Sequence, residues 1–398
     1  MITKLKRILV LMLLFFFVFF IAVLVSVSLY DSPEYARRIL MYGQSDINDY
    51  YIFSRRPIDN GSEISELERN LGGLPKTITW YDPMVQKERT EKLDELFELT
   101  ATNAFIVLRD DKIIYEGYFN GMGPDSIHTS FSSAKSFNSA LIMAAVADGL
   151  IGSVNDPVIQ YVPEITGRGF DNMTIRDLLL MSTGIRYVEN PYLGPFGDDA
   201  LTYYSPDLRR TAVRVRASVA PVGEAWHYNN YYPLLEGLVL ERVTGVSVAE
   251  YLQERFWKPM GAEYPASWSL DSDVSGFEKM ESGINARAVD FARFGSIFLH
   301  NGYWNGSQIL PEDFVLESTS PDGAWDVSPG PEMSMYYKYH WWGLNNPDGT
   351  YDFTAAGRYG QFVYVAPRKN MVIVRLGDET DYPFSWLLFM QSLVNEME

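Results

Sequence analysis

The chain has 398 residues, a formal net charge of −18 and no cysteine. So acidic a chain is poorly suited to bind nucleic acid, because neutralising phosphates needs a basic surface. The absence of cysteine excludes disulfides, thiolate metal sites and a cysteine nucleophile. The four histidines are scattered and form no His-Glu-x-x-His pattern, so we expect no metal. A hydrophobic content of 47% is ample for a large core, in one two-lobed unit or in two domains.

An uninterrupted apolar run at the N-terminus predicts a membrane span. Residues 8–25 are all apolar, and residues 26–30 extend the run to a length that crosses a bilayer. Three basic residues precede it, so the positive-inside bias predicts a cytoplasmic stub at 1–7, a single-pass anchor at 8–30 and a periplasmic or cell-surface body. A cleaved signal peptide is the rival interpretation, although the run exceeds a usual signal core and Val-Ser-Val-Ser-Leu-Tyr is a poor cleavage site. The lack of polar periodicity disfavours a buried core helix.

The segment after the anchor leads into a predicted β-hairpin. Residues 31–80 mix charged residues, aromatic residues and turn formers, which predicts a linker that becomes an ordered wrap around the body. Residues 88–99 carry apolar side chains at helical spacing among charges and predict an amphipathic helix. Residues 104–109 and 112–119 are β-rich runs on either side of an Asp-Asp pair, which predicts two hairpin strands.

The stretch from His128 to Leu150 contains the chain's one Ser-x-x-Lys, formed by Ser132 and Lys135. Apolar residues then recur at helical spacing, so both side chains should lie in the first turn of a buried helix, on one face. A serine hydroxyl needs a base to take its proton, and a lysine withdrawn from water can be that base. Unpaired N–H groups at the helix start can bind a developing oxyanion. Taken alone, so short a pattern favours a helix cap and a solvated lysine.

The rest of the chain predicts a helical middle between two β-rich ends. The middle, about residues 150–335, is expected to be mostly helix and loop. Its predicted helices are 174–181, 231–242, 248–256 and 286–300, and a Gly, Pro and aromatic-rich loop at 184–199 could line a cleft. Near the end, the predicted elements are strands at 362–365 and 371–376 and a helix at 384–394. Strands at both ends predict one antiparallel sheet with a helical lobe inserted, in the α/β (α+β) class.

Two further constellations follow the Ser-x-x-Lys. Tyr228 and Asn230 open an apolar helix, which places a phenol and an amide on one tight loop. A tyrosine beside a cationic lysine can share or relay the serine's proton. The run at 357–361, Gly-Arg-Tyr-Gly-Gln, leads into a predicted strand, where glycines allow close approach and a strand N–H can be a second oxyanion donor. Taken singly, these patterns fit a packing tyrosine and a hairpin turn.

In this order the three motifs resemble those of the serine β-lactamase and penicillin-binding-protein superfamily, whose first motif is Ser-x-x-Lys. The chain looks most like the class C-like β-lactamase-related hydrolases, including carboxylesterases and 6-aminohexanoate-dimer hydrolases. The connecting stretches that match are residues 152–158, 162–164, 174–179, 221–230 and 341–343. The resemblance implies a catalytic domain at 81–398, with an antiparallel sheet flanked by N- and C-terminal helices and the site between this sheet and the helical lobe.

The resemblance also implies roles for particular residues. Ser132 would be the acylated nucleophile, Lys135 its base, and Tyr228 the group that assists proton transfer and activates the deacylating water. The backbone N–H groups of Ser132 and Gln361 would form the oxyanion hole, and Asn230 would orient the substrate. No cofactor is implied, and the expected partner is a small-molecule or peptide amide or ester.

The third motif departs from the family pattern, in which Lys or His often precedes a small residue and Gly. Here Arg358, Tyr359 and Gly360 occupy the positions. Tyr359 would narrow the cleft, and Arg358 would replace the lysine in recognising a carboxylate. The variant Gly-x-x-Gly-Gln is nearer that of the amide and ester hydrolases, and Tyr192 occupies a place comparable to the loop tyrosine that contacts the amide in the aminohexanoate group.

The sequence therefore predicts a membrane-anchored serine hydrolase that cleaves an amide or ester through an acyl-enzyme. One alternative is a Ser-His-Asp hydrolase that uses His128 or His227, although the chain has no Gly-x-Ser-x-Gly. A second alternative, from another class, is a non-catalytic protein on the same fold that binds a peptide or a cell-wall fragment.

Overall fold

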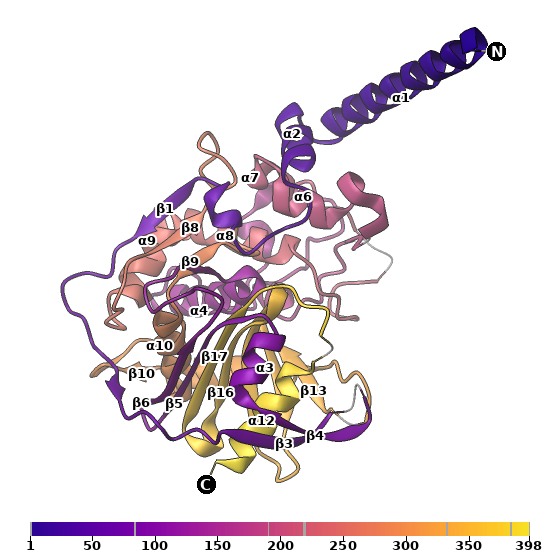
Figure 1. Cartoon of the computed structure of the whole chain (residues 1–398). Coiled ribbons are helices and arrows are strands. Elements are labelled where there is room, and N and C mark those ends of the chain that lie inside the picture. The colour runs from indigo at the N-terminus through magenta and orange to yellow at the C-terminus, as the bar shows by residue number, and fades with distance from the viewer. Residues whose placement is uncertain are drawn as a thin grey trace.

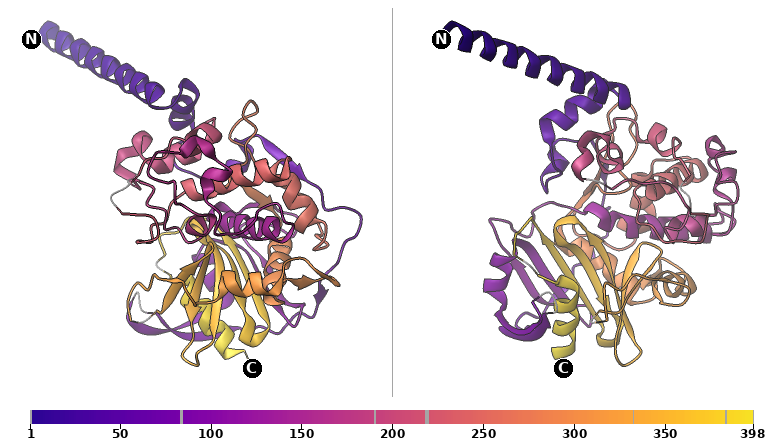
Figure 2. Two further views of the ribbon diagram at one scale, coloured as in Figure 1. Left: turned by 180° about the vertical axis from the view of Figure 1, so that it is seen from behind. Right: turned by 90° about the vertical axis from the view of Figure 1, so that its right-hand side faces the viewer.

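The computed structural model describes residues 2–82, 85–189, 191–217, 220–331, 333–382 and 384–397. A lobe built on a large sheet and a mostly helical lobe lie against each other, and the long N-terminal helix α1 (Ile2–Tyr30) projects from the helical lobe (Figure 1). This arrangement confirms the predicted antiparallel sheet with an inserted helical lobe. Helix α4 (Ala134–Ala147) lies at the boundary between the lobes in all the views (Figure 2).

A nine-stranded sheet joins the two ends of the chain. In sheet order the strands are β12 (Trp325–Asp326), β13 (Met335–Lys338), β14 (Trp341–Asn345), β15 (Tyr351–Gly357), β16 (Gln361–Ala366), β17 (Met371–Gly377), β5 (Thr102–Arg109), β6 (Lys112–Tyr118) and β2 (Glu68–Arg69). The neighbours pair antiparallel except β2 and β6, which pair parallel. The pairing of β17 with β5 joins the C-terminal strands to the N-terminal strands of the sheet, because β17 lies near the C-terminus and β5 begins at Thr102.

Helices cover both faces of this sheet, so its central strands are buried on both sides. On one face, α4 and α10 (Ala288–Leu299) pack through Phe137 and Phe294, whose rings stack with centroids 3.6 Å apart. On the other face, α3 (Leu93–Leu99) and α12 (Trp386–Glu396) form a second core with the strands. Strand β17 is buried along its whole length, which explains its almost uninterrupted apolar sequence.

The helical lobe also contains short strands that the sequence did not predict. Its helices are α5 (Ile175–Leu179), α6 (Asp198–Tyr204), α7 (Leu208–Ala212), α8 (Tyr231–Thr244), α9 (Val248–Leu252) and α11 (Glu312–Thr319). A four-stranded sheet runs in the order β1 (Arg55–Ile58), β8 (Ala266–Ser269), β9 (Ile284–Ala286) and β7 (His128–Thr129). Outside this lobe, beside α10, a small hairpin pairs β10 (Tyr303–Trp304) with β11 (Ser307–Gln308) (Figure 1). Strands of two to four residues are too short to show a periodic pattern.

The helix predicted at residues 88–99 is wrong in its first half. Residues Lys87–Lys92 form strand β4, which pairs antiparallel with β3 (Thr77–Asp82), and only α3 is helical. The sequence Lys-Glu-Arg-Thr-Glu-Lys has no apolar residue that could reveal the two-residue period of a strand. Its side chains instead contact those of the neighbouring strand β3. Arg89 donates to Asp82 at 2.9 Å, and the hydroxyls of Thr79 and Thr90 lie 3.0 Å apart.

Two other local predictions, a hairpin and a helix start, are confirmed. Both depend on residues that favour a particular backbone conformation over a few neighbouring positions. The hairpin between β5 and β6 turns through Asp110 and Asp111, whose φ angles of 50° and 62° suit a tight two-residue turn. Helix α5 begins with a capping box, in which Thr174 and Asp177 each accept a hydrogen bond from the other's backbone N–H.

The apolar N-terminal run forms one helix that is fixed to the body at its end. Lys4–Tyr30 is long and apolar enough to cross a membrane, and an 18-residue window within it has a mean hydropathy of 3.5, which suits a membrane anchor or a signal sequence. Its last turn packs on the helical lobe: Val27 is buried, and the Tyr30 ring meets the Phe196 ring edge-on at 5.5 Å. Ser32 then caps α2 (Pro33–Tyr42), which leads the chain over the body.

Candidate active site

Ser132 and Lys135 meet at the start of α4, as their spacing predicts. Ser132 lies in a 3₁₀ turn, Phe131–Ser133, that runs directly into the helix, and its side chain is half-buried. Lys135 is 1% exposed, and its Nζ donates to Ser132 Oγ at 2.9 Å and to the Glu281 carbonyl at 3.2 Å. The lysine is therefore withdrawn from water and is in contact with the hydroxyl that it would have to activate.

Tyr228 completes the cluster from a distant part of the chain. It lies in the loop before α8, and Lys135 Nζ sits 4.8 Å from the centre of its ring, within cation–π range. The rings of Tyr337 and Trp342 pack against Tyr228 at 6.2 and 5.9 Å and hold it in place. The structure therefore brings together the three residues that the sequence motifs singled out.

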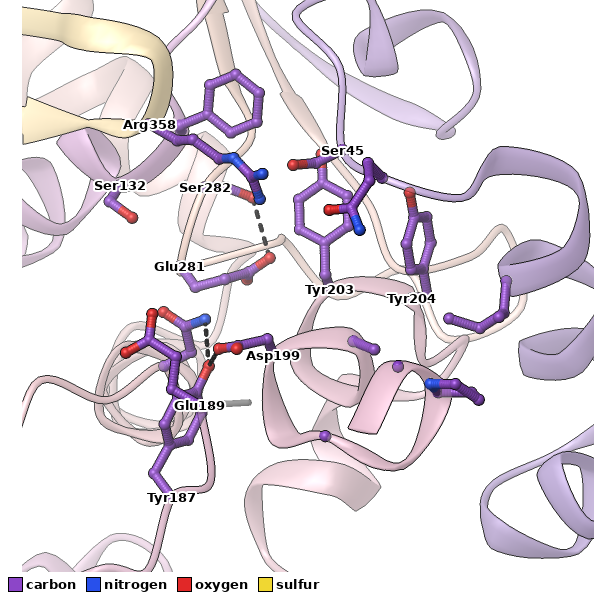
Figure 3. A pocket seen from close by; sticks show the side chains of 18 of the residues that line it. Ser45, Ser132, Tyr187, Glu189, Asp199, Tyr203, Tyr204, Glu281, Ser282 and Arg358 are labelled. Carbon is purple, nitrogen blue, oxygen red and sulfur yellow. Dashed lines mark hydrogen bonds between the residues drawn. The ribbon is translucent and has the colours of Figure 1, made fainter. Parts of the chain in front are cut away.

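Ser132 and Tyr228 border a cavity of about 730 Å³ between the two lobes. Ser132 and Arg358 lie on one side of it, and Tyr203, Tyr204 and Ser45 lie on the other (Figure 3). The loop predicted to line a cleft does so, since residues of 187–199 form a wall together with the start of α6. Residues 39–45 of the N-terminal segment form a further wall, so the predicted wrap is part of the site.

The glycine-rich run at 357–361 packs directly against the turn that carries Ser132. A Cβ atom on Gly357 would lie 2.4 Å from the Ser130 carbonyl and 3.1 Å from the Ser132 nitrogen, so the absence of a side chain permits this approach. The Arg375 guanidinium, 1% exposed, holds the run by donating to the carbonyls of Tyr359 and Gly360. The edge of β15 and the serine are thus fixed relative to each other.

Gln361, expected to supply an oxyanion donor, is engaged on several sides. Its carbonyl accepts from Ser133 Oγ at 2.9 Å, and its side-chain amide donates to the Gly377 carbonyl at 2.7 Å. Among the described residues that line the cavity, Arg358 is present, whereas Gln361 and Gly360 are not. The Arg358 side chain faces the cavity beside Ser132 (Figure 3).

The remaining predicted substrate residues divide into those at the cavity and those behind it. Asn230 lines the cavity and donates to the Tyr187 hydroxyl at 2.8 Å. The Tyr359 hydroxyl instead donates to the Ser45 carbonyl, and its ring meets Phe131 edge-on at 5.3 Å, so it braces the N-terminal wall from behind. The side chain of Tyr192 lies outside the described residues.

Three carboxylates at the cavity were not predicted. Glu189, Asp199 and Glu281 all line it, and isolated acidic residues in loops give no pattern from which to find them. Burial raises the pKa of Asp199, and the hydrogen bond from the Tyr187 hydroxyl opposes that rise. Glu281 is 2% exposed and forms an ion pair with the buried Lys279 at 3.0 Å. The cavity therefore carries more acidic than basic side chains.

The two histidines of the alternative triad lie away from this arrangement. Within the described part of the chain, neither His128 nor His227 lines the cavity that Ser132 borders. His128 is buried on β7, its Nε2 has no hydrogen-bond partner there, and desolvation lowers its pKa to about 4. His227 packs against the Tyr187 ring at 6.3 Å. The contact to Ser132 Oγ comes from Lys135 instead.

Fold and site together define a β-lactamase-type hydrolase. Residues 99–383 match the Beta-lactamase family, which is more than half of the chain, and the chain belongs to that family. This finding confirms the resemblance that the three motifs indicated.

Particular relatives narrow the comparison. The 6-aminohexanoate-dimer hydrolase of Paenarthrobacter ureafaciens is 29% identical over 318 residues, which cover 74% of this chain and 76% of that protein. A solved structure from Bacillus anthracis, described as a candidate 6-aminohexanoate-dimer hydrolase, is 26% identical with a TM-score of 0.76 and covers 88% of this chain and 92% of its own. A class C β-lactamase shares the fold at 15% identity with a TM-score of 0.56, covering 76% and 94% of the two chains.

Proposed function

We propose that this chain is a membrane-anchored serine hydrolase that cleaves an amide or ester bond through an acyl-enzyme on Ser132. The observation that carries the proposal is the 2.9 Å contact from the buried Lys135 ammonium to Ser132 Oγ, beside a cavity large enough for a small substrate. The apolar helix α1 would hold this site outside the cytoplasm.

In acylation, Lys135 acts as a neutral amine: Ser132 Oγ attacks the carbonyl carbon of the substrate while the hydroxyl proton moves to the lone pair of Lys135 Nζ. The charged Lys135 that results donates to the Glu281 carbonyl and lies over the Tyr228 ring. The tetrahedral intermediate then expels the amine or alcohol, which takes a proton relayed by Lys135 and Tyr228. Water activated by the same two groups attacks the ester on Ser132 and releases the acid.

The oxyanion would be bound by two backbone N–H groups. Ser132 supplies one from the nucleophile turn, and the run at 357–361 supplies the other. Contacts in the run favour the N–H of Arg358 over that of Gln361. Gly357 approaches the Ser132 nitrogen closely and Arg358 follows it at the cavity, whereas Gln361 does not line the cavity.

The charges at the cavity suggest a linear substrate with an amino group near the scissile bond. Glu189 and Asp199 provide anionic partners for an ammonium, and Arg358 provides a cation for a carboxylate. The similar protein from Paenarthrobacter ureafaciens is named for a dimer of 6-aminohexanoate, which carries an amino group and a carboxylate. We therefore expect linear amides with a free amine to react faster than β-lactams.

Labelling with a fluorophosphonate probe tests the reaction class. The full chain should be labelled, and Ser132→Ala should abolish labelling. Lys135→Ala should slow labelling by about a hundred- to ten-thousand-fold, the usual effect of removing a positioned proton-transfer group. His128→Ala and His227→Ala are the matched controls and should label at nearly the wild-type rate.

Two outcomes would contradict the proposal. Labelling that persists in Lys135→Ala but disappears in a histidine variant would support the Ser-His-Asp alternative. A folded protein that no serine-directed probe labels, and that hydrolyses none of a panel of esters, linear amides, D-amino-acid peptides and β-lactams, would support the binding-protein alternative.

Protease treatment of spheroplasts tests the anchor separately. The body after Tyr30 should be digested in intact spheroplasts, since the positive-inside bias sends it out of the cytoplasm. Full protection would overturn the proposed orientation without affecting the chemistry at Ser132.

A further inference from the structure

A second cavity lies where α1 meets the body. Its volume is about 290 Å³, and the last residue of α1, Tyr30, lines it together with Asp31. Three arginines line it as well: Arg186, Arg214 and Arg216. Such a concentration of guanidinium groups is unusual in a chain whose net charge is −18.

Backbone contacts hold these arginines together. The N–H of Arg186 donates to the Arg216 carbonyl at 2.8 Å, beside an antiparallel bridge between residues 185 and 217. Arg214 and Arg216 are two positions apart, and both are exposed at the same cavity. In the part of the chain that the structure describes, no hydrogen bond or ion pair engages the side chain of any of the three. Their charge is available to a ligand.

The two aspartates at the cavity offset the charge of these three arginines only in part, because Asp31 is paired with Arg210 and Asp198 supplies a single negative charge. Asp31 Oδ1 pairs with Arg210 at 2.6 Å. Asp198 accepts from the Tyr231 hydroxyl at 2.7 Å and from the Val188 N–H at 2.6 Å. The cavity therefore presents unpaired guanidinium groups next to satisfied carboxylates, which suits an anion with several acceptor oxygens.

The position of the cavity identifies the source of that anion. Tyr30 is the last residue of the apolar helix, and the buried Val27 and the contact of the Tyr30 ring with Phe196 fix the helix end to the cavity wall. If α1 crosses a bilayer, the cavity lies at the depth of the lipid headgroups, where tyrosine rings commonly sit. The rest of the acidic body would be repelled from an anionic membrane surface, so attraction has to be local.

We propose that this cavity binds the phosphate of an anionic phospholipid headgroup from the bilayer that α1 enters. The inference rests on the anchoring part of the proposed function and is independent of the hydrolytic chemistry. The forked guanidinium groups of Arg186, Arg214 and Arg216 hold the phosphate oxygens, and the aromatic rings at the cavity rim face the glycerol region. The bound lipid fixes the helical lobe, and with it the wall at residues 39–45, against the membrane surface.

Native mass spectrometry of the full chain in a neutral detergent tests the site. Phosphatidylglycerol and phosphatidylcholine are added at equal concentration, and the lipid adducts are counted. We expect a preferred phosphatidylglycerol adduct on the wild type. Each arginine near a membrane surface strengthens anionic lipid binding by about fivefold, so a variant with all three arginines changed to Gln should lose about a hundredfold in phosphatidylglycerol affinity.

The charge-matched control carries Lys87→Gln, Lys92→Gln and Lys112→Gln, on β4 and β6 at the end of the body opposite α1 (Figure 1). It should keep the phosphatidylglycerol adduct. Equal loading of the two lipids on the wild type, an undiminished adduct on the arginine variant, or displacement by inorganic phosphate at the concentration of the lipid would each overturn the proposal. Because binding is measured in detergent, it is distinguishable from failure of the anchor, which carbonate extraction of membranes reports.

Discussion

Replacing Gly357 with alanine is the sharpest test of how the glycine-rich run positions the site. The φ angle of Gly357 is −132°, which any residue adopts, so the backbone conformation itself does not require glycine. The lack of space requires glycine, because the new Cβ would lie 2.4 Å from the Ser130 carbonyl, 3.0 Å from Ser133 Oγ and 3.1 Å from the Ser132 nitrogen. Two of these neighbours are backbone atoms, which cannot rotate away.

The size of the effect follows from these contacts. Ordinary van der Waals contact requires about 3.5 Å, so β15 and the nucleophile turn must separate by about 1 Å. That separation moves the Ser132 N–H away from the donor at the edge of β15, and a displacement of about 1 Å can cost about a hundredfold in rate. Overpacking of this kind destabilises a fold by about 1–3 kcal/mol, so the protein should still fold.

The assay compares the rate of probe labelling at Ser132, and kcat for a substrate from the panel, with the thermal unfolding midpoint. Gly330→Ala is the matched control, because Gly330 lacks a positive φ and a Cβ there would meet nothing within 4 Å. The control should behave as the wild type. If Gly357→Ala remained folded and reacted within about twofold of the wild type, the proposed positioning of the oxyanion donors would be refuted.

Three further predictions concern pH, the N-terminal wall and the substrate amide. The pKa of His128 is about 4 in the fold and 6.5 unfolded, so the unfolded state binds more protons between these values. Stability should therefore fall as pH drops from 6.5 to 4, by up to about 3 kcal/mol, and thermal melts of His128→Leu should lose this dependence. Tyr359→Phe removes the bond to the Ser45 carbonyl, so KM should rise severalfold with kcat nearly unchanged. Asn230→Ala should lower kcat/KM about tenfold for amides, with little change in melting.

The contact between Ser132 and Lys135 was predictable because its signal is local. Ser132 and Lys135 are three residues apart, and helical geometry alone places them on one face. The hairpin at 110–111 and the capping box at Thr174 were equally local. Tyr228 is different: its loop pattern occurs elsewhere in the chain, and only tertiary packing against Tyr337 and Trp342 sets its position under Lys135.

Features that depend on long-range pairing gave no sequence signal. The charged sequence of β4 looks like the first turns of an amphipathic helix. It forms a strand because it pairs with β3, and it has no buried apolar face that would reveal a strand in the sequence. Glu281 reaches the cavity through a turn held by Lys279 and Lys135, which no spacing rule connects. Residues 39–45 were placed in a wrap, but their place in the cavity wall depends on Tyr359, which lies about three hundred residues later in the chain.

Trapping the acyl-enzyme tests the central claim most directly. An activated ester is mixed with the full chain, the reaction is quenched in acid, and the modified peptide is mapped by mass spectrometry. The acyl group should be found on Ser132, which borders the cavity, and not on Ser130 or Ser133, which are buried and donate to carbonyls. Acylation of either neighbouring serine, or turnover with no residue acylated at any quench time, would contradict the account.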